Sequence, residues 1–334
     1  MVLALPVLRH LKSHYPASRI YWWIDSRLNS LLEGDPDLEG VILFERRHWR
    51  RPAGWLNLWR SVRQARAMGF DLVIDLQGLA RSAAFAWLVN GALTVGLDDS
   101  REGAPGLYDV IVPRPAARRH AADWYLEVLR RLKIPLAPSI NWMPAHPRVR
   151  ERVQERWQTA GSQWIALIPG AKWGDKRWPA EHFAAVARRL GQAALTVRFV
   201  VLGGLEDAGL GREIAGHLPG RCLNLAGKTT LPEMVEWIRL AEFVVSNDTG
   251  PMHVAAALGK PVWAVFGPTD PAETGPYGQI ERTFRLNLPC SPCQSPTCRH
   301  APPMECLRAL DPGMVSGAIL ASRMGLGAFV PPAS

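Results

Sequence analysis

An alternation of short apolar runs and amphipathic segments constrains the fold of this chain more than any other sequence feature. Apolar runs predict strands, and apolar residues repeated every three or four positions predict helices. In the first half, strands are expected at 20–24, 41–44, 72–76 and 110–112, and helices at 3–14, 55–68, 79–89 and 121–132. A linker with Pro135, Pro138, Pro144 and Pro147 follows, and the alternation resumes with a helix at 148–158 and strands at 164–168, 197–202, 223–225, 243–246 and 262–266. This pattern predicts two doubly wound α/β domains, with ligands at the carboxyl ends of the strands in the cleft between them.

Size and composition describe a chain of about two domains. The chain has 334 residues, of which 48% are hydrophobic, so a well-buried core is expected. No apolar run approaches the roughly 20 residues of a transmembrane helix. The N-terminus also lacks the pattern of a secretory signal. The sequence therefore predicts a cytoplasmic protein.

The net charge of +9 is concentrated in the first half, where Arg and Lys crowd into 45–66 and 114–133. A basic face suits an anionic acceptor or the anionic inner leaflet of a membrane, where each nearby basic residue contributes about 1 kcal/mol. Solvated helix faces are the alternative reading. Nucleic acid is a further candidate partner, but no recognisable nucleic-acid motif accompanies the charge, and we expect none to bind.

The turn at 247–250 is the strongest candidate for an anion site. The apolar run 243–245 predicts a buried strand, and Asn247-Asp248-Thr249-Gly250 ends it before a helix that has Pro251 in its first turn. A strand, a short turn and a helix aim backbone N–H groups and a positive dipole end at one point, which suits a phosphate. His253 falls in the first turn of this helix. The alternative is an ordinary βαβ unit with a glycine turn.

Two other predicted strands of the second half end in polar turns. The turn after 164–168 runs from Pro169 to Pro179 and contains Lys172, Lys176 and Arg177. The strand at 197–202 runs into Gly203-Gly204, and Glu206 follows at the position where an acidic residue accepts hydrogen bonds from ribose hydroxyls in dinucleotide folds. Solvated basic residues and an exposed loop glutamate are the alternative interpretations.

The stretch from Asp248 to Gly278 closely resembles the signature of the heptosyltransferases, the family 9 glycosyltransferases that build the lipopolysaccharide core. Members carry D-[ST]-G-x-x-H, an alanine-rich helix, F-G-x-T and an end similar to T-G-P-Y-G. This chain has Asp248-Thr249-Gly250 with His253, Ala255–Ala257, Phe266–Thr269 and Thr274–Gly278. The resemblance covers nearly the whole chain and implies the GT-B fold of two Rossmann-like domains facing across a cleft. It implies an acceptor domain at 1–147, a donor domain at 148–312, and a C-terminal helix and tail at 313–334 that crosses back onto the first domain.

For the donor, the resemblance implies roles residue by residue. Lys176 matches the lysine that binds donor phosphate in a P-G-x…K-x-W-P run that begins at Pro169-Gly170, with Lys172 and Arg177 as helpers. Glu206 matches the family's acidic position at the ribose. Asp248 holds hydroxyls of the donor sugar, Thr249 and Gly250 hold the diphosphate, and His253 assists the leaving group. Lys176 and His253 are thus the catalytic candidates, and Gly227-Lys228-Thr229-Thr230-Leu231 matches a run near the base.

For the acceptor, the resemblance points to the loop after the strand at 72–76. Asp75 to Ser82 is similar to the family's D-x-Q-G-x-x-[KR]-S run, and Gln77 and Arg81 are the acceptor-binding candidates. His120, preceded by Arg118 and Arg119, matches an H-x-x-[DE] helix start, for which a purely structural role is equally expected. Asp35-Pro36-Asp37 looks like a D-x-D metal motif, but its position in a proline turn favours a solvent-exposed turn.

The chain opens with Met1-Val2-Leu3-Ala4-Leu5-Pro6, which predicts a helix with no strand before it. Members of the resembled family open with an apolar strand and a G-D loop, whose aspartate is the proposed catalytic base. By this resemblance the first strand is absent and the base lies upstream of Met1. The missing strand has three possible explanations: the start of the chain is assigned too late, the chain is a truncated form, or the sequence evolved without the strand. A sheet without that strand would have unpaired edges next to its switch point.

Four of the five cysteines, Cys290, Cys293, Cys298 and Cys306, follow the spacing C-x2-C-x4-C-x7-C in a proline-rich loop at 289–306. In a cytosolic protein this spacing favours a metal clip over disulfides, and a tetrahedral zinc site would suit a loop that cannot form a regular ladder. Reduced thiols without metal and an iron–sulfur centre are the alternatives. Cys222 reads as a buried strand residue.

Taken together, the resemblance implies an inverting glycosyltransferase that moves heptose from ADP-heptose to a lipopolysaccharide core acceptor of the lipid A-Kdo type. No cofactor is expected in the chemistry, because Lys176 and the helix start at Gly250 carry the charge of the leaving group, and zinc would be structural only. The protein would work in the cytoplasm, in peripheral contact with the inner face of the inner membrane. The alternatives are a donor-binding module without activity, a GT-B nucleotide-sugar epimerase, and a basic metal-clip protein that binds nucleic acid.

Overall fold

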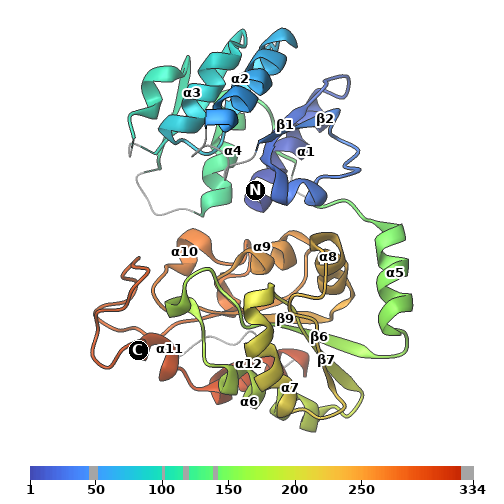
Figure 1. Cartoon of the computed structure of the whole chain (residues 1–334). Helices are drawn as coiled ribbons and strands as arrows, with labels where there is room; N and C mark the ends of the chain where they lie inside the picture. The colour runs from blue at the N-terminus through green and yellow to red at the C-terminus, as the bar shows by residue number, and fades with distance from the viewer. Residues whose placement is uncertain (45–51, 100–101, 116–119, 138–141, 325–334) are drawn as a thin grey trace. The chain divides into compact units, whose positions relative to one another are not determined.

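A computed structural model describes residues 1–44, 52–99, 102–115, 120–137 and 142–324. The chain divides into two compact units, Leu3–Pro144 and Ala145–Ser334 (Figure 1). Three parts of the sequence predictions lie outside the described residues. They are Pro138 of the expected linker, residues 45–51 of the basic stretch 45–66, and Arg118 and Arg119. Each unit is described by itself.

The second unit is built on one six-stranded parallel sheet in the order β11-β10-β9-β6-β7-β8. This is the doubly wound order, with the first strand of the unit, β6, at the centre beside β9. Five of these strands were predicted from apolar runs, and β11 has only two residues, too few to give a pattern. The strands are β6 (Gln163–Ile168), β7 (Val197–Val201), β8 (Cys222–Asn224), β9 (Phe243–Asn247), β10 (Val262–Val265) and β11 (Thr283–Phe284).

Helices cover both faces of this sheet, with α8 and α9 on one side and α6, α7 and α12 on the other (Figure 1). The first turn of α8 follows from its sequence, because Thr230 and Glu233 form a reciprocal capping box. The helices are α5 (Pro147–Trp157), α6 (Ala180–Ala193), α7 (Ala208–Gly216), α8 (Leu231–Leu240), α9 (Gly250–Ala257), α10 (Pro271–Thr274), α11 (Glu305–Arg308) and α12 (Pro312–Arg323), with short 3-10 turns η5 (Gly174–Lys176), η6 (Leu205–Asp207) and η7 (Ile280–Arg282).

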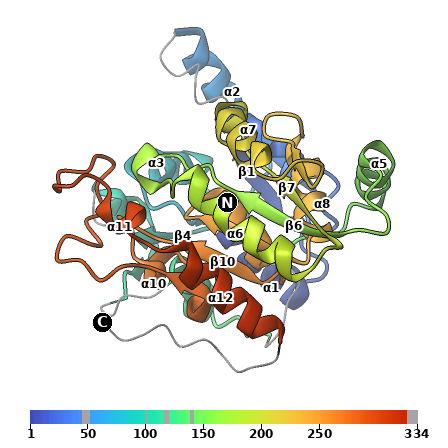
Figure 2. The ribbon, with the colours of Figure 1, turned by 90° about the horizontal axis from the view of Figure 1, so that it is seen from below.

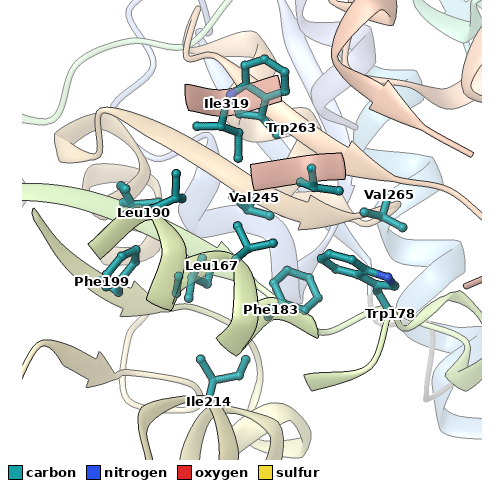
Figure 3. Close-up of a cluster of buried hydrophobic side chains, with 14 of the residues drawn as sticks. Leu167, Trp178, Phe183, Leu190, Phe199, Ile214, Val245, Trp263, Val265 and Ile319 are labelled. Atoms are coloured by element: carbon teal, nitrogen blue, oxygen red, sulfur yellow. The ribbon is translucent and has the colours of Figure 1, made fainter. Parts of the chain in front are cut away.

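The core of the second unit lies between the sheet and α6, where Phe183, Phe199 and Leu167 are fully buried (Figure 3). Burying each of these side chains contributes about 1.5–3 kcal/mol. Trp178 closes one end of the cluster and donates from Nε1 to the carbonyl oxygen of Leu310 at 3.2 Å. Large apolar side chains of the strands and of α6 thus anchor the loop that follows β6, because Trp178 at its end is buried in the same core.

The C-terminal helix α12 belongs to this core, because Val315, Ala318 and Ile319 pack into it and α12 lies against α6 (Figure 2). A C-terminal helix was expected within 313–334, and α12 begins at Pro312 and ends at Arg323. The apolar stripe of this helix packs within the second unit, and the expectation that the tail crosses back onto the first domain stays a prediction.

The first unit contains two parallel sheets in its described residues. β1 (Tyr21–Asp25) pairs with β2 (Gly40–Phe44), and β3 (Leu72–Asp75) pairs with β4 (Leu93–Asp98), which pairs with β5 (Val110–Pro113). Among the described strands, β1 and β3 each pair along one edge only. The helices are α1 (Leu5–His14), α2 (Pro52–Ala67), α3 (Ala80–Val89) and α4 (Ala121–Arg131), with 3-10 turns η1 (Val2–Ala4), η2 (Ser26–Leu31) and η4 (Ala104–Leu107).

Strand β4 is missing from the sequence prediction. Gly96 interrupts its apolar run, and glycine normally argues against a strand interior. In the structure a Cβ at Gly96 would lie 2.2 Å from the ring of Tyr108, so the glycine makes room for that ring inside the unit. The packing of a distant side chain therefore decides this position.

The Asp35-Pro36-Asp37 turn is not a solvent turn, and that prediction is wrong. Asp35 is 5% exposed, and its two carboxylate oxygens accept from Nη1 and Nη2 of Arg9 at 2.6 and 2.5 Å. Arg9 also reaches Asp37 at 2.6 Å and the carbonyl oxygen of Trp142 at 3.1 Å. A buried arginine on α1 thus clamps the turn, and the two aspartates are occupied by structure.

Candidate functional site

The candidate site of the second unit lies where β6 and β9 end side by side. Ile168 at the end of β6 pairs with Ser246 of β9, and the helices that follow these two strands cover opposite faces of the sheet. A crevice forms at such a switch point because the connections diverge, and α/β proteins bind ligands there. Four loops reach this edge: 169–179, 203–207, 247–250 and 266–269.

Asn247, the last residue of β9, ties the first of these loops to the strand. It is fully buried, donates from Nδ2 to the carbonyl oxygen of Pro169 at 2.7 Å, and accepts at Oδ1 from the N–H of Trp178 at 3.1 Å. The two bonds hold both ends of the 169–178 loop. The Asn247 side chain therefore caps backbone groups of this loop.

Lys176 and Asp248 meet at the centre of the site. The Lys176 ammonium lies 2.6 Å from Oδ2 of Asp248, and the same oxygen accepts from the hydroxyl of Thr269 at 2.7 Å. The indole of Trp173 lies under the ammonium at 4.7 Å. Both charged side chains are mostly shielded, which strengthens their attraction. An ammonium with further N–H donors beside a helix start is a suitable partner for a phosphate.

Thr269 is a site residue whose role the sequence reasoning missed. The F-G-P-T run was noticed only as part of the signature, although β10 pairs with β9 and therefore ends beside Asp248. The pairing order of the strands supplies the missing information, since adjacent parallel strands deliver their following loops to the same edge.

Asp207 was also missed. Its carboxylate is buried, accepts from the N–H of Gly204 at 3.0 Å, and pairs with Arg177 at 3.4 Å. Burial raises the pKa of the Asp207 carboxyl above its ordinary value, against the hydrogen bond from Gly204 and the charge of Arg177. The sequence favoured Glu206 next to it, and Glu206 is exposed on the 3-10 turn η6. Of these two adjacent acidic residues, Asp207 therefore holds the loop and Glu206 faces solvent.

The position of Asp207 explains why residue 170 is a glycine. A Cβ at position 170 would lie 2.2 Å from Oδ2 of Asp207, so the close approach of the two loops requires a glycine. We expect Gly170→Ala to lower the free energy of unfolding by about 1–3 kcal/mol, because the carboxylate must leave its bonds to Gly204 and Arg177. Urea denaturation followed by tryptophan fluorescence measures this.

Gly174→Ala is the matched control, because no atom lies within 4 Å of a Cβ at that position. Its effect should stay within about 0.5 kcal/mol. In an Asp207→Ala background, Gly170→Ala should cost much less than alone. Equal effects of Gly170→Ala and Gly174→Ala would contradict the assignment.

The N-terminus of α9 completes the site. Thr249 is the N-cap residue in an extended conformation and makes no capping hydrogen bond with its side chain, and a proline stands in the first turn, as predicted. The N–H groups of this turn and the positive end of the helix dipole face the edge at which Asp248 and Lys176 lie. His253, half-buried, belongs to the same turn.

The Gly227–Leu231 segment packs on the same edge. Gly227 has a φ of +74° and donates to the carbonyl oxygen of Gly203 at 3.0 Å, while Thr230 caps α8. A Cβ at position 227 would lie 2.7 Å from Cα of Leu205, so both the backbone conformation and the close approach demand glycine. This segment therefore supports the loop that carries Glu206.

In the first unit, Asp75 organises the loop with the acceptor candidates. Its Oδ1 accepts from the N–H groups of Gln77 and Gly78 at 2.8 and 3.3 Å, and its Oδ2 accepts from the hydroxyl of Tyr108 at 2.8 Å. Burial, with the nearby Asp75 charge, strongly raises the pKa of Tyr108, so the phenol remains a donor. Gln77 and Arg81 are both exposed at the end of this loop, as acceptor-binding residues would be.

His120 has a structural role. It is the N-cap residue of α4, and its Nδ1 accepts from the N–H of Ala122 at 3.1 Å. This satisfies one of the free N–H groups of the helix start.

Cys290, Cys293, Cys298 and Cys306 line one pocket of about 460 Å³ in the second unit, together with His300 and Asp175. None of the five cysteines forms a disulfide. The N–H of Met304 donates to Sγ of Cys298 at 3.3 Å. Within the described residues, however, no three Cys, His, Asp or Glu side chains are arranged to hold a metal ion. The pocket thus gathers the four thiols, and the zinc site that their spacing predicts stays a prediction.

The thiols should differ in reactivity. Burial raises the pKa of the Cys222 thiol to about 12, and burial with the three neighbouring cysteines raises that of Cys306 to about 11. At pH 8 only about one Cys306 in a thousand is then a thiolate. We expect iodoacetamide, followed by mass spectrometry, to label the exposed Cys293 well before either. Labelling of Cys306 as fast as Cys293 would contradict this order of reactivity. Zinc in the purified protein, with protection of all four cysteines from labelling, would support the zinc prediction.

The chain is similar to known glycosyltransferases. The sequence model of glycosyltransferase family 9 (heptosyltransferase) matches residues 55–303. The chain is 41% identical to lipooligosaccharide heptosyltransferase 2 of Haemophilus influenzae over 86% of this chain and 85% of that protein. It is 40% identical to lipopolysaccharide heptosyltransferase 2 of Salmonella typhimurium over 86% of this chain and 84% of that protein. The solved E. coli ADP-heptose lipopolysaccharide heptosyltransferase II has a TM-score of 0.75 at 23% identity, covering 98% of this chain and 96% of that one.

The parallel α/β sheets of the two units and the likeness to that solved structure define the fold class as GT-B. The family match covers about three quarters of the chain, and the two relatives exceed 30% identity over most of their own length. The chain therefore belongs to glycosyltransferase family 9, the heptosyltransferase family, as its sequence signature predicted.

Proposed function

We propose that the chain transfers heptose from ADP-heptose to a lipopolysaccharide core acceptor of the lipid A-Kdo type, with inversion at the anomeric carbon. The observation that carries this proposal is the Lys176–Asp248 pair at the switch point, beside the N-terminus of α9. One group suits the phosphates of a nucleotide sugar and the other suits its hydroxyls. The curated relatives named above act on lipopolysaccharide or lipooligosaccharide by their names.

The donor diphosphate would lie against Lys176 and the first turn of α9. Departure of the nucleoside diphosphate leaves negative charge on its oxygens, and fixed N–H donors stabilise that charge most when they are already in position. Lys176 is held by Asp248 and Trp173, and the helix N–H groups are fixed by the backbone. Arg177 binds the carbonyl oxygen of Ala171 and pairs with Asp207, so it maintains the loop.

Asp248 would accept hydrogen bonds from hydroxyls of the donor sugar. Thr269 fixes one of its oxygens and leaves the other for the sugar. In an inverting transfer the acceptor hydroxyl oxygen bonds to the anomeric carbon from the face opposite to the departing diphosphate. The bond to the diphosphate breaks as the new bond forms, and a base removes the hydroxyl proton. His253 would hydrogen-bond the leaving group from the first turn of α9.

Solved relatives support the donor assignment. One is the E. coli heptosyltransferase WaaC with ADP, and another contains ADP-2-deoxy-2-fluoro heptose. Those two proteins share the fold of this chain, and their ADP and ADP-sugar ligands are the reason for proposing a nucleoside-diphosphate sugar as the donor here. No metal or cofactor enters the proposed reaction, so chelation by EDTA should leave the transfer rate unchanged. A lipid-borne acceptor would require the reaction to take place at the cytoplasmic face of the inner membrane, and we propose that the chain is peripheral there. In the described residues no helix is long and apolar enough to cross a bilayer.

The test is calorimetric titration with ADP and UDP, followed by transfer from ADP-heptose to a heptose-free lipid A-Kdo acceptor. Micromolar binding of ADP, weaker binding of UDP and a heptosylated product support the proposal. ADP binding without transfer, in the presence of acceptor, would support the inactive donor-binding module. Interconversion of free nucleotide sugars without acceptor would support an epimerase.

A further inference from the structure

Helices α2 and α3 of the first unit present large apolar side chains to solvent. Trp59 on α2 is 55% exposed and Trp87 on α3 is 58% exposed. Met68, directly after α2, is also exposed, and the two helices are in contact with each other. Tryptophan has a large apolar surface that proteins normally cover. An exposed indole on each of two helices that contact each other makes this part of the first unit a candidate for a contact with a partner.

The same surface is basic. The exposed side of α2 carries Trp59, Arg63 and Arg66 at the spacing i, i+4 and i+7, so these residues lie on one stripe of the helix. Val62 and Ala65 are buried on the face next to this stripe and attach the helix to the unit. Residues 52–67 contain no acidic residue. The stripe is thus amphiphilic, with indole beside guanidinium, and it faces away from the core.

Few partners satisfy both properties. Tryptophan is enriched at the interface between bilayer and water, where its ring lies among headgroups. Helices with tryptophan and arginine on their outer side bind in the plane of that interface. Anionic headgroups attract the arginines within about a Debye length, roughly 10 Å at 0.1 M salt.

We propose that the surface formed by Trp59, Met68 and Trp87 with Arg63 and Arg66, here called the α2–α3 surface, docks on a bilayer of anionic lipids. The proposal rests on the proposed function in one respect: a lipid-borne acceptor requires the enzyme to work at a membrane. It goes beyond that function because it assigns the contact to particular residues of the acceptor unit. The indoles enter the headgroup layer, and the arginines pair with lipid phosphates.

The experiment is co-sedimentation of the full chain with two kinds of vesicle, each at low and at high salt. One kind is pure phosphatidylcholine, and the other also contains roughly 30% of the anionic lipid phosphatidylglycerol. We expect binding to the anionic vesicles only, weakened at high salt. Trp59→Ala/Trp87→Ala should weaken it about tenfold or more, since both indoles leave the interface. Arg63→Glu/Arg66→Glu should abolish it, because two attractive charges become repulsive.

Leu195→Ala/Leu205→Ala is the matched control. These leucines are highly exposed on the second unit, and their removal should leave vesicle binding unchanged. Circular dichroism of each variant checks folding, and Arg63→Gln/Arg66→Gln gives a milder charge change if Trp59→Ala/Trp87→Ala fails to fold. Wild-type binding that is equal to both vesicle types, or unaffected by the tryptophan and arginine variants, overturns the proposal. Tight binding of single-stranded DNA that the same variants abolish, without vesicle binding, also overturns it.

Activity separates this proposal from the proposed function. With a water-soluble acceptor oligosaccharide that lacks acyl chains, the α2–α3 variants should transfer heptose at the wild-type rate. With the lipid acceptor in vesicles their rate should fall in parallel with binding. Vesicle binding by a chain that transfers no heptose would contradict the proposed function alone. Transfer to the soluble acceptor without vesicle binding would contradict the docking surface alone.

Discussion

Replacing Lys176 with alanine is expected to lower the rate of sugar transfer about 100- to 1000-fold, the range found when one fixed donor to a developing anion is removed. Lys176 is the ammonium that lies within 2.6 Å of Asp248 beside the first turn of α9. Without it the departing diphosphate retains only the helix N–H groups. The affinity for ADP should fall as well, by about tenfold or more, because the ground state carries the same phosphates. Steady-state transfer kinetics and calorimetry measure the two effects.

Lys172→Ala is the control for this prediction, because Lys172 is exposed on the same loop. It should retain nearly all activity. Since Lys176→Ala also leaves the shielded Asp248 without its cation, the double variant Lys176→Ala/Asp248→Asn tests whether the loss is structural. Recovery of activity in the double variant, or an unchanged affinity for ADP in Lys176→Ala, would refute the role of Lys176.

Arg9→Ala should lower the free energy of unfolding by about 3–5 kcal/mol, the cost of leaving one member of a buried ion pair without its partner. The Arg9 guanidinium is 7% exposed and binds Asp35 through two nitrogens, Asp37 through one, and the carbonyl oxygen of Trp142. Removal leaves the Asp35 carboxylate buried and uncompensated. Urea denaturation, with circular dichroism as the signal, measures the change.

The control is Arg27→Ala, which breaks the exposed pair with Asp25 at 2.7 Å. An exposed pair contributes about 0–1 kcal/mol. Arg9→Met/Asp35→Leu should recover much of the stability, because it replaces two charges with apolar groups of similar size. An Arg9→Ala variant no less stable than Arg27→Ala would show that the clamp is dispensable.

The sequence predicted the regular elements well and some long-range relations poorly. Strands β6, β7, β9 and β10 are continuous apolar runs, as strands buried on both faces must be, and their positions were predicted within one or two residues. Strand β4 was missed because it contains Gly96, which makes room for the ring of Tyr108, twelve positions later in the sequence. Local patterns do not contain such packing.

The site divides in the same way. Lys176, Asp248, Thr249 and Gly250 were identified by motif, and the structure brings the first two together. Asp207 and Thr269 were not identified, because their roles depend on which strands are neighbours. Asp35 shows the reverse error: a proline turn suggests exposure, but an arginine 26 positions earlier in the chain buries it. Assignments of ligand roles to Glu206, His253, Gln77 and Arg81 stay predictions.

The attachment of the 169–178 loop by Asn247 has a consequence for redesign. Both of its bonds go to backbone atoms, the carbonyl oxygen of Pro169 and the N–H of Trp178, and neither depends on the side chains between them. The two ends of the loop are therefore anchored independently of its middle residues. Exchanging residues 171–175 for those of enzymes that use other nucleotide sugars should alter donor preference while the ends of the loop, and the stability of the sheet below, remain as they are.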